Sequence, residues 1–317
     1  MGARRVVVVG GTGFVGRHVS AALAARGDDV LVLARRVPSA GLPYRARALD
    51  VATLEPAALA AVFDAEQPDA VVNATGGKWN LTDAELPSSC TIPTWSVTAA
   101  LERTRCRPRL VHLGSVLERV QEPPGAPAGA TVPTQPESMY GRAKLAATQA
   151  VLAATRAGSV DATVLRLANV VGPGVPPDSL LGRVVVRLVD AAGRDRSARV
   201  ELSPLRAHRD YVDVRDVAEA VVSATRESVT GRVIGVGRGE AVPVRSLVEM
   251  LIEVSGVPTE VVELPDRPGS VEVVDWARVD PGPARDLLGW RPRRSLRDAV
   301  GGLWDEAVSR LPDRSRR

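Results

Sequence analysis

The sequence predicts an α/β fold, in which a doubly wound parallel sheet is followed by a smaller C-terminal domain. Short β-branched runs alternate with alanine- and leucine-rich stretches through the first half of the chain, as expected for strands joined by crossover helices. At 317 residues, 45% of them hydrophobic, the chain can bury a large core. We expect residues 1–172 to form the sheet domain and residues 173–317 the smaller one, with segments near 207–237 returning to the first.

Each expected element of the first half has a local signature. Residues 5–9 end in four consecutive valines, which is typical of a strand buried on both faces. The helix that follows is expected to stop at Gly27, because glycine favours the position just after a helix. Further strands are expected at residues 30–34, 46–49, 70–73, 109–113 and 162–167. Helices are expected at residues 15–26, 54–63, 97–104 and 140–157.

The alternation loosens beyond Gly172. Residues 180–192, 214–226 and 244–255 have the periodicity of helices. A short β-branched run at residues 233–236 predicts one more strand. No internal repeat is present, so these segments are expected to form a single smaller domain.

Composition argues against several classes of protein. We expect no membrane span and no secretory leader, because the apolar run near the start is only four valines long and leads straight into glycines. The two cysteines fit a reducing compartment, so we expect a cytoplasmic protein. The net charge of +4 comes from arginines scattered among acidic residues, and aromatic residues make up only 3%. We therefore expect no nucleic-acid binding, no membrane binding and no metal site.

A glycine-rich turn follows the first strand and opens the first helix, with the sequence Gly-Gly-Thr-Gly-Phe-Val-Gly at residues 10–16. The glycines allow a tight turn and a close approach to a pyrophosphate, which the helix N-terminus attracts with its free N–H groups. This context predicts a dinucleotide site in a Rossmann-type sheet. The residues expected to bind the cofactor here are Gly10, Thr12, Gly13, Phe14, Val15 and Gly16.

The residues after the next strands indicate which dinucleotide is bound. Arg35 and Arg36 follow the second strand, where a site for NAD usually offers an acidic residue to the ribose. Two guanidinium groups can instead clamp a 2′-phosphate, so NADP (as NADPH) is the expected cofactor. Asp50 and Val51, after the third strand, are expected to contact the adenine. The residues expected to line the far side of the cofactor are Asn73, Ala74, Thr75 and Gly76.

A phenol and an ammonium lie one helical turn apart at Tyr140 and Lys144. Free tyrosine ionises near pH 10, so it needs a nearby positive charge to bring its pKa toward the working range. The chain has only two lysines among its many basic residues, which favours a specific task for each. Ser115 ends the fifth strand, where its hydroxyl can hold a substrate oxygen beside Tyr140. These three residues predict a site for proton transfer.

Taken together, these motifs resemble the extended short-chain dehydrogenase/reductases, in particular the branch of nucleotide-sugar epimerases, dehydratases and 4-ketoreductases. The resemblance covers almost the whole chain. It also includes Arg166 to Gly174, the run Arg209 to Ala218 and the segment Leu287 to Pro292. Each motif is moderately specific by itself, but their order along the chain is characteristic of this family.

The resemblance implies a role for several residues. Ser115, Tyr140 and Lys144 would be the catalytic triad. Asn169 would lie at the nucleotide-sugar site, and Arg209 and Arg267 would contact the nucleotide diphosphate. Lys78 is expected near the mouth of the substrate pocket. Many relatives pair through a helix bundle, so a homodimer is the default expectation.

Departures from the family pattern narrow the expected reaction. Dehydratases of this branch place Asp-Glu directly after the triad hydroxyl, whereas Ser115 is followed by Val116 and Leu117. Epimerases of the branch keep NAD bound, and the pair Arg35-Arg36 favours a consumed NADPH instead. We therefore expect an NADPH-dependent oxidoreductase, a 4-ketoreductase of a nucleotide-activated 4-keto-deoxyhexose. The sugar carrier is expected to be dTDP, and the arginine-rich composition fits deoxysugar and antibiotic biosynthesis.

Three alternatives stay open at this point. A nucleotide-sugar epimerase would hold NAD tightly and oxidise no added cofactor. A reductase of a non-sugar ketone would ignore the diphosphate, so Arg209→Ala and Arg267→Ala would leave its KM unchanged. A cofactor-sensing regulator would bind NADP without turnover, although such a protein has no use for a phenol paired with an ammonium.

Overall fold

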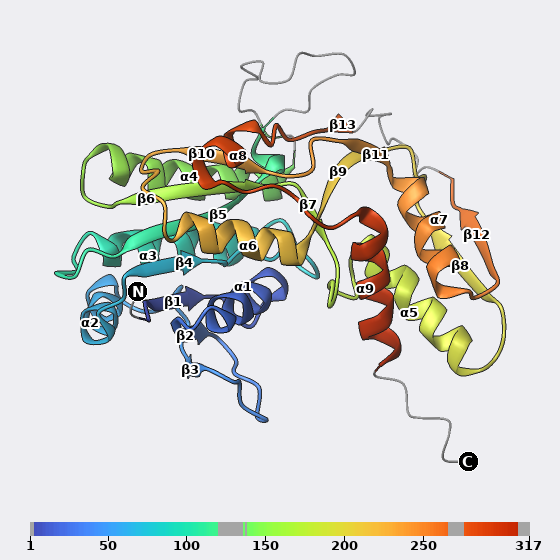
Figure 1. Ribbon diagram of the computed structural model, residues 1–317, viewed down its shortest axis with the longest axis horizontal. Coiled ribbons are helices and arrows are strands. Elements are labelled where there is room, and N and C mark those ends of the chain that lie inside the picture. The colour runs from blue at the N-terminus through green and yellow to red at the C-terminus, as the bar shows by residue number, and fades with distance from the viewer. Residues whose placement is uncertain (1–2, 120–135, 137, 266–275, 310–317) are drawn as a thin grey trace.

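A seven-stranded parallel sheet forms the centre of the computed structural model, which describes residues 3–119, 136, 138–265 and 276–309 (Figure 1). The strand order is β10-β6-β5-β4-β1-β2-β3, so it reverses between β1 and β4. The strands are β1 (Arg5–Val9), β2 (Asp29–Ala34), β3 (Arg45–Ala48), β4 (Ala70–Asn73), β5 (Arg109–Ser115), β6 (Ala162–Leu167) and β10 (Val233–Val236). This arrangement confirms the predicted doubly wound α/β fold.

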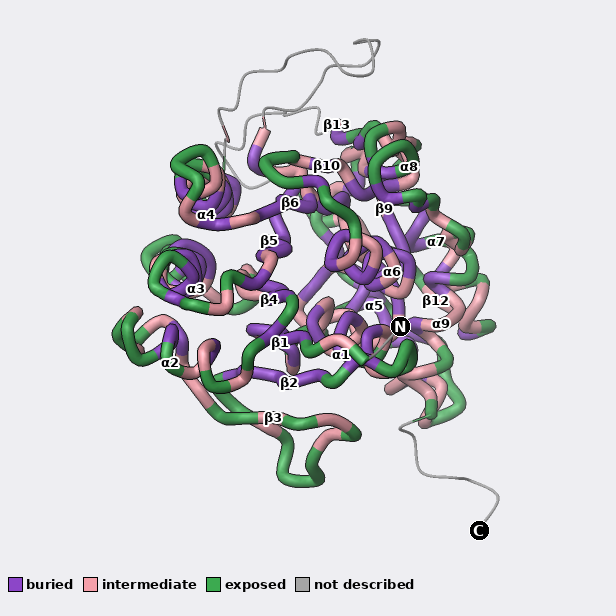
Figure 2. The backbone as a smooth tube through the Cα atoms, turned by 60° about the vertical axis from the view of Figure 1, so that its left-hand side comes forward, coloured by how far each residue is buried: buried purple, intermediate pink, exposed green. Residues whose placement is uncertain are grey.

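Helices cover both faces of this sheet (Figures 1 and 2). On one face lie α1 (Phe14–Ala25), α6 (Val214–Ala224) and α8 (Gly282–Leu288). On the other lie α2 (Pro56–Glu66), α3 (Ile92–Leu101) and α4 (Met139–Arg156). The valines of β1 show why both faces must be covered. Val6 and Val8 belong to the core under α1 and α6, whereas Val7 and Val9 face the opposite core.

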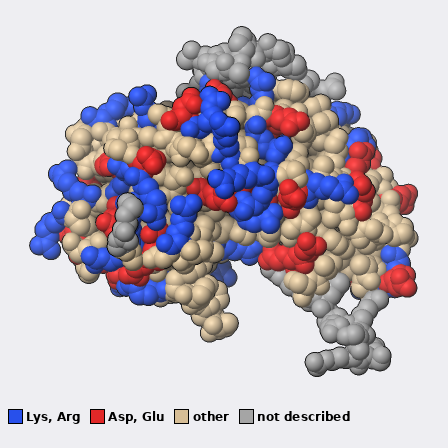
Figure 3. Space-filling view, in the orientation of Figure 1, with Lys and Arg blue, Asp and Glu red and all other residues tan. Residues whose placement is uncertain are grey.

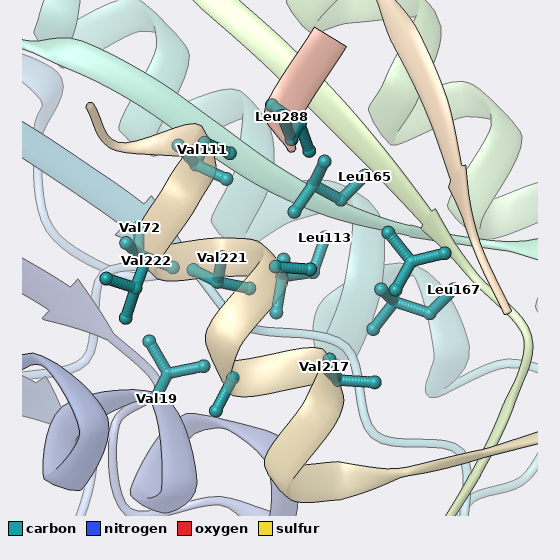
Figure 4. Packing of buried hydrophobic residues seen from close by; sticks show 14 of the residues in the cluster. Val19, Val72, Val111, Leu113, Leu165, Leu167, Val217, Val221, Val222 and Leu288 are labelled. Atoms are coloured by element: carbon teal, nitrogen blue, oxygen red, sulfur yellow. The ribbon is translucent and has the colours of Figure 1, made fainter. Parts of the chain in front are cut away.

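The core beneath α6 joins segments that are far apart in the sequence. Val217, Val221 and Val222 of α6 pack among residues of the central strands, with Val19 of α1 and Leu288 of α8 close by (Figure 4). The next strand, β10, pairs in parallel with β6 and extends the sheet. Three elements beyond residue 207, α6, β10 and α8, therefore complete the first sheet and its cover.

The remaining elements pack around a second core. Helices α5 (Leu180–Gly193), α7 (Val244–Ser255) and α9 (Leu296–Val308) enclose it together with the parallel pair β8 (Ala198–Leu202) and β12 (Thr259–Glu263). A small sheet stands between the two cores in Figure 1. Its strands are β7 (Asn169–Val171), β9 (His208–Asp213), β11 (Ala241–Pro243) and β13 (Trp276–Ala277). These short strands, α8 and α9 were not predicted.

One helix boundary was wrong. The helix expected at residues 97–104 is α3, which begins at Ile92 after a π-helical turn at Pro87–Thr91. The first turns of this helix do not show apolar periodicity, because polar threonines occupy buried positions there. Thr94 and Thr98 are buried and donate their hydroxyls to carbonyls one turn back, at 2.9 and 2.8 Å. Pro93 lies in the first turn, where the missing N–H has no cost.

The surface shows basic and acidic side chains interspersed on the face drawn in Figure 3. None of the helices in the described ranges is both long and apolar enough to cross a membrane. In the same ranges no group of three or more His, Cys, Asp and Glu side chains is arranged to hold a metal ion.

Candidate active site

A cavity of about 360 Å³ opens at the carboxyl ends of the central strands. It lies where the strand order reverses, the position at which open parallel sheets bind ligands. Its walls come from the glycine turn, the loop after β4, the end of β5, the start of α4, β7 and the start of α5. The predicted residues among them are Gly13, Phe14, Val15, Ala74, Thr75, Gly76, Lys78, Ser115, Tyr140, Lys144 and Asn169.

The glycine turn is shaped by close backbone contacts. Gly10 has a φ of +78°, a conformation that L side chains rarely adopt. A side chain at Gly16 would collide with the carbonyl oxygen of Gly10, so only glycine lets α1 approach the turn this closely. Helix α1 starts at its N-cap, Gly13, without a side-chain cap. Its first N–H groups therefore have no side-chain acceptor, and the turn fits the phosphates of a dinucleotide.

Lys144 is buried to 98% on α4, one turn after Tyr140. Its Nζ donates to the carbonyl oxygens of Leu113 and Thr75, the latter at 3.4 Å. These carbonyls end β5 and follow β4, so the ammonium bridges two neighbouring strands at the floor of the cavity. Burial lowers the pKa of Lys144, while the negative charges of Cys90 and Glu118 act to raise it.

Tyr140 is hydrogen-bonded to the side chain of Ser115. Burial raises the pKa of Tyr140 well above its usual value, the charges of Cys90 and Glu118 raise it further, and the Ser115 hydrogen bond lowers it. In the protein without cofactor the pKa of the phenol is therefore raised, with burial as its main cause. The phenol is protonated at neutral pH and can serve as a proton donor.

Ser115 stands at the junction of β5 and a 3₁₀ turn at Val116–Glu118. Its Oγ accepts the N–H of Leu117 at 3.2 Å, which fixes the hydroxyl toward Tyr140. Helix α4 packs directly on this turn, since a side chain at Gly141 would collide with the carbonyl oxygen of Leu117. The contact between Gly141 and the turn thus sets the distance between the phenol and the serine.

Lys78 places a second ammonium on the wall of the same cavity. Its Nζ lies 4.5 Å from the ring centre of Trp79 and 5.5 Å from that of Tyr140. Burial lowers the pKa of Lys78, and the positive charge of Arg209 lowers it further. Both lysines of the chain therefore line one cavity, and the positive charge of Arg209 acts on Lys78 at its wall.

Other predicted site residues lie outside this cavity. Asn73 is fully buried behind the wall, where its side chain binds Thr75 and Thr94 and holds the loop after β4. Arg35 and Arg36 are exposed at the end of β2. Asp50 caps a turn by accepting the N–H of Ala52 at 3.0 Å, and neither it, buried Val51 nor Arg209 lines the cavity. Arg267 falls outside the described residues.

Comparisons with known proteins agree with this arrangement. Residues 6–237 match the family described as the NAD dependent epimerase/dehydratase family. The chain is also 44% identical over 300 residues to the dTDP-6-deoxy-L-talose 4-dehydrogenase (NAD(P)(+)) of Kitasatospora kifunensis, covering 95% of this chain and 94% of the relative. The chain belongs to the NAD dependent epimerase/dehydratase family. The resemblance inferred from the motifs is thereby confirmed.

More distant relatives and solved structures align along nearly the whole chain. The GDP-6-deoxy-D-mannose reductase of Pseudomonas aeruginosa is 26% identical, over 97% of this chain and 98% of the relative. The structure of RMD from Pseudomonas aeruginosa complexed with NADPH matches with a TM-score of 0.81 and 24% identity, covering 98% and 100% of the two chains. The Thermus thermophilus UDP-glucose 4-epimerase complex with NAD matches at 0.80 and 24%, covering 97% and 100%. These structures share the fold.

The structure explains family motifs that do not reach the cavity. In the run Arg209 to Ala218, Asp213 caps α6 and binds Arg215 at 2.6 Å. Asp216 is fully buried and accepts the backbone N–H groups of Arg293 and Arg294, at 3.0 and 2.9 Å. Asp213 thus fixes the start of α6, and Asp216 joins α6 to the segment before α9, so this part of the run is architectural.

Sequence reasoning missed four residues around the site. Cys90 and Glu118 influence both catalytic groups, Arg166 pairs with Glu118, and Gly141 sets the approach of α4. Gly141 lies inside the predicted motif and carried a signal, because glycine disfavours a helix interior. Glu118 carried a local signal as well, because Ser115 and Glu118 have the spacing of a capping box. Cys90 and Arg166 are brought to the site only by tertiary contacts.

Proposed function

We propose that the chain is an NADPH-dependent 4-ketoreductase of a nucleotide-activated 4-keto-6-deoxyhexose, with a dTDP-linked sugar as substrate. The observation that carries the proposal is the cluster of Ser115, Tyr140 and Lys144 on one cavity beside the glycine turn. The relative from Kitasatospora kifunensis, whose name describes the 4-dehydrogenase reaction on dTDP-6-deoxy-L-talose, supports the sugar, its carrier and the position of the reaction. Reduction of the 4-ketone is the reverse of that reaction.

Each residue of the cluster has a task in this reaction. A nicotinamide bound along the glycine turn would supply the hydride. Ser115 donates a hydrogen bond to the ketone oxygen and holds it against Tyr140, whose phenol gives its proton as the oxygen gains charge. Lys144 would hold the ribose of a bound cofactor from the floor of the cavity and would stabilise the tyrosinate that remains.

The alternatives fit less well. A dehydratase needs acidic groups beside the sugar, but Val116 and Leu117 line the cavity after Ser115. An epimerase retains its cofactor, whereas the exposed pair Arg35 and Arg36 suits a 2′-phosphate on a cofactor that is exchanged at each turnover. A cofactor-sensing regulator catalyses no reaction, so it has no need for the buried ammonium of Lys144 one helical turn from the phenol of Tyr140.

The test is to follow the oxidation of NADPH and of NADH separately, with a panel of nucleotide 4-keto sugars that differ in base and in sugar. We expect oxidation of NADPH with dTDP-4-keto-6-deoxy sugars and formation of a 4-hydroxyl product. Tightly bound NAD, with no net oxidation of added cofactor and exchange of sugar epimers, would establish an epimerase instead. Reduction of simple ketones alone would remove the nucleotide sugar from the proposal.

The arginine pair predicts a measurable cofactor preference. The double substitution Arg35→Ala and Arg36→Ala should raise the KM for NADPH about tenfold or more, because a hydrogen bond to a charged group contributes about 1.5–3 kcal/mol. The KM for NADH should change little, since NADH lacks the 2′-phosphate. Arg26→Ala is the matched control, because Arg26 is an exposed arginine at the other end of the sheet domain. Equal effects on both cofactors would contradict the assignment.

Lys78 predicts an effect on substrate binding. Its partly buried ammonium faces the cavity between two aromatic rings, so a diphosphate or sugar anion entering there would gain a charge-assisted hydrogen bond. Lys78→Met should raise the KM for the nucleotide sugar about tenfold and leave the KM for NADPH nearly unchanged. Lys78→Arg keeps the charge and should retain most of the affinity. An unchanged substrate KM in Lys78→Met would place the anion elsewhere.

A further inference from the structure

Two adjacent side chains of α1 bind one carbonyl group in the loop between β7 and α5. Nη2 of Arg17 and Nε2 of His18 each lie 2.9 Å from the carbonyl oxygen of Pro173, at least 155 positions further along the chain. Because a carbonyl oxygen only accepts hydrogen bonds, Nε2 of His18 carries the proton of its bond. The oxygen has two lone pairs, and α1 supplies a donor for each of them.

The surroundings of Pro173 keep this contact in place. Helix α9 packs closely on the proline ring, since a Cβ at Gly302 would lie 3.1 Å from its Cγ. Arg17 also pairs with Glu306 of the same helix at 3.4 Å. The next residue of the loop, Gly174, has a φ of +72°, and a Cβ there would overlap the guanidinium of Arg17. The loop therefore turns directly beneath the arginine, held between α1 and α9.

The contact connects two parts of the cavity wall. Phe14, one helical turn before His18, lines the cavity, and its ring meets the imidazole edge-on with the ring centres 6.1 Å apart. Val175 and Pro176, which follow Pro173 after one glycine, line the same cavity. The two donors are not themselves part of the wall. They can therefore act on a ligand in the cavity only through these neighbours.

We propose that Arg17 and His18 are positioning residues of the substrate site. By holding the carbonyl of Pro173, they fix the adjoining wall of the cavity relative to the glycine turn at the start of the same helix. The inference rests on the proposed reductase function, in which the sugar ketone and the nicotinamide must meet at about 3–3.5 Å. One helix then places both reactants, because its first turn faces the cofactor and its next residues hold the wall against which the sugar lies.

Removing the two donors should weaken the binding of the sugar but not of the cofactor. Arg17→Met and His18→Phe keep much of the bulk of each side chain and lose the hydrogen bonds to Pro173. In the double variant the KM for the nucleotide sugar should rise about fivefold to tenfold, and kcat should fall by a smaller factor. The Kd for NADPH without sugar should change by less than about twofold, because the glycine turn is untouched.

Two further variants distinguish positioning from a general loss of stability. His18→Gln retains an Nε2 donor and should restore most of the affinity that His18→Phe loses. Arg4→Met is the matched control, because Arg4 donates to the carbonyl oxygen of Thr225 at 2.7 Å, across 221 positions and away from the cavity wall. A merely architectural role would lower the melting temperature in Arg17→Met and Arg4→Met alike and leave the sugar KM unchanged in both. That result would overturn the proposal.

Amide hydrogen exchange in the loop gives a readout without turnover. The N–H of Val175 donates to the carbonyl of Gly172 at 3.2 Å, and that of Ser179 to the carbonyl of Pro176 at 3.0 Å. A peptide covering residues 172–182 should exchange about fivefold faster in His18→Phe than in Arg4→Met, since loss of the hydrogen bond favours local opening. His18→Phe retains the bond from Arg17, so it should fold even where the double variant does not. Equal exchange in the two variants would contradict the inference.

The exchange and the kinetics together separate this inference from the proposed function. If the loop exchanges faster but the unsubstituted protein reduces no nucleotide sugar, the proposed function fails and the dependence of the loop on α1 stands. If reduction occurs and the loop exchanges faster without a rise in the sugar KM, the proposed function stands and the positioning role fails.

Discussion

Tyr140→Phe is expected to lower turnover of the nucleotide 4-keto sugar by about 10²–10⁴-fold, the contribution typical of a positioned proton donor. Burial holds the pKa of the phenol above its usual value, so the hydroxyl is protonated when the ketone arrives. Phenylalanine fills the same space but has no proton to give. The glycine turn and Lys144 are untouched, so the affinity for NADPH should stay within about twofold, the change expected when no cofactor contact is lost.

Tyr44→Phe is the matched control for this experiment. Tyr44 is partly buried and loses the same hydroxyl, but it lies against Ser20 on the other side of the sheet from the catalytic helix. Its substitution should leave turnover nearly unchanged. Steady-state rates with NADPH and cofactor titration by fluorescence are the two measurements required. Undiminished turnover in Tyr140→Phe would show that another group protonates the ketone, and the enzymatic interpretation would have to be rebuilt around it.

The sheet domain could be predicted because its signals are local. The valines Val6 to Val9 predict a strand buried on both faces, and the glycine turn indicates where this strand ends. Strands β1, β4, β6 and β10 have the expected bounds. Most strands of the second half lack such signals. β8 carries Arg199 and Glu201 on its exposed face and is only five residues long, so its pairing with β12 depends on a partner some 60 residues away.

The candidate site likewise contains residues that have a local sequence signal and residues that depend on distant contacts. Tyr140 and Lys144 could be found because one helical turn joins them, and the helix fixes their relation whatever the rest of the chain does. For Glu118 the sequence indicates only a capping box with Ser115, because its ion-pair partner Arg166 lies 48 positions further along the chain on the next strand. Asn73 shows the same dependence on distant residues. It was expected to line the cofactor from the end of β4, and its buried amide donates to Thr94 of α3 at 3.0 Å, a contact that no local pattern indicates.

The same contrast explains the pKa of Tyr140. The sequence places an ammonium near the phenol, and pairwise reasoning from that spacing predicts a lowered pKa. The structure adds the burial of the ring and the carboxylate of Glu118, both of which favour the neutral phenol. Only the folded protein contains these contributions, because the packing of α4 on the turn after β5 creates both. The protein without cofactor is therefore prepared to donate a proton, which is the state that reduction requires.

Gly16→Ala is expected to weaken the binding of NADPH by about 100-fold or more, since misplacing the turn removes several charge-assisted hydrogen bonds to phosphate at once. The added methyl group would collide with the carbonyl oxygen of Gly10, so α1 must move away from the turn that cradles the pyrophosphate. Because Gly16 is buried, some loss of stability accompanies this shift. Cofactor titration of the purified variant, together with its melting temperature, measures both effects.

Gly301→Ala is the matched control for the turn. Gly301 lies within α9, and a methyl group there would meet nothing within 4 Å, so the substitution should slightly stabilise the helix and leave cofactor binding unchanged. A Gly16→Ala protein that is folded and binds NADPH normally would mean that the dinucleotide does not lie along α1. The tyrosine, the lysine and the serine would then face a cavity without a hydride donor. The proposal therefore depends as much on the backbone at Gly16 as on the three side chains that carry the chemistry.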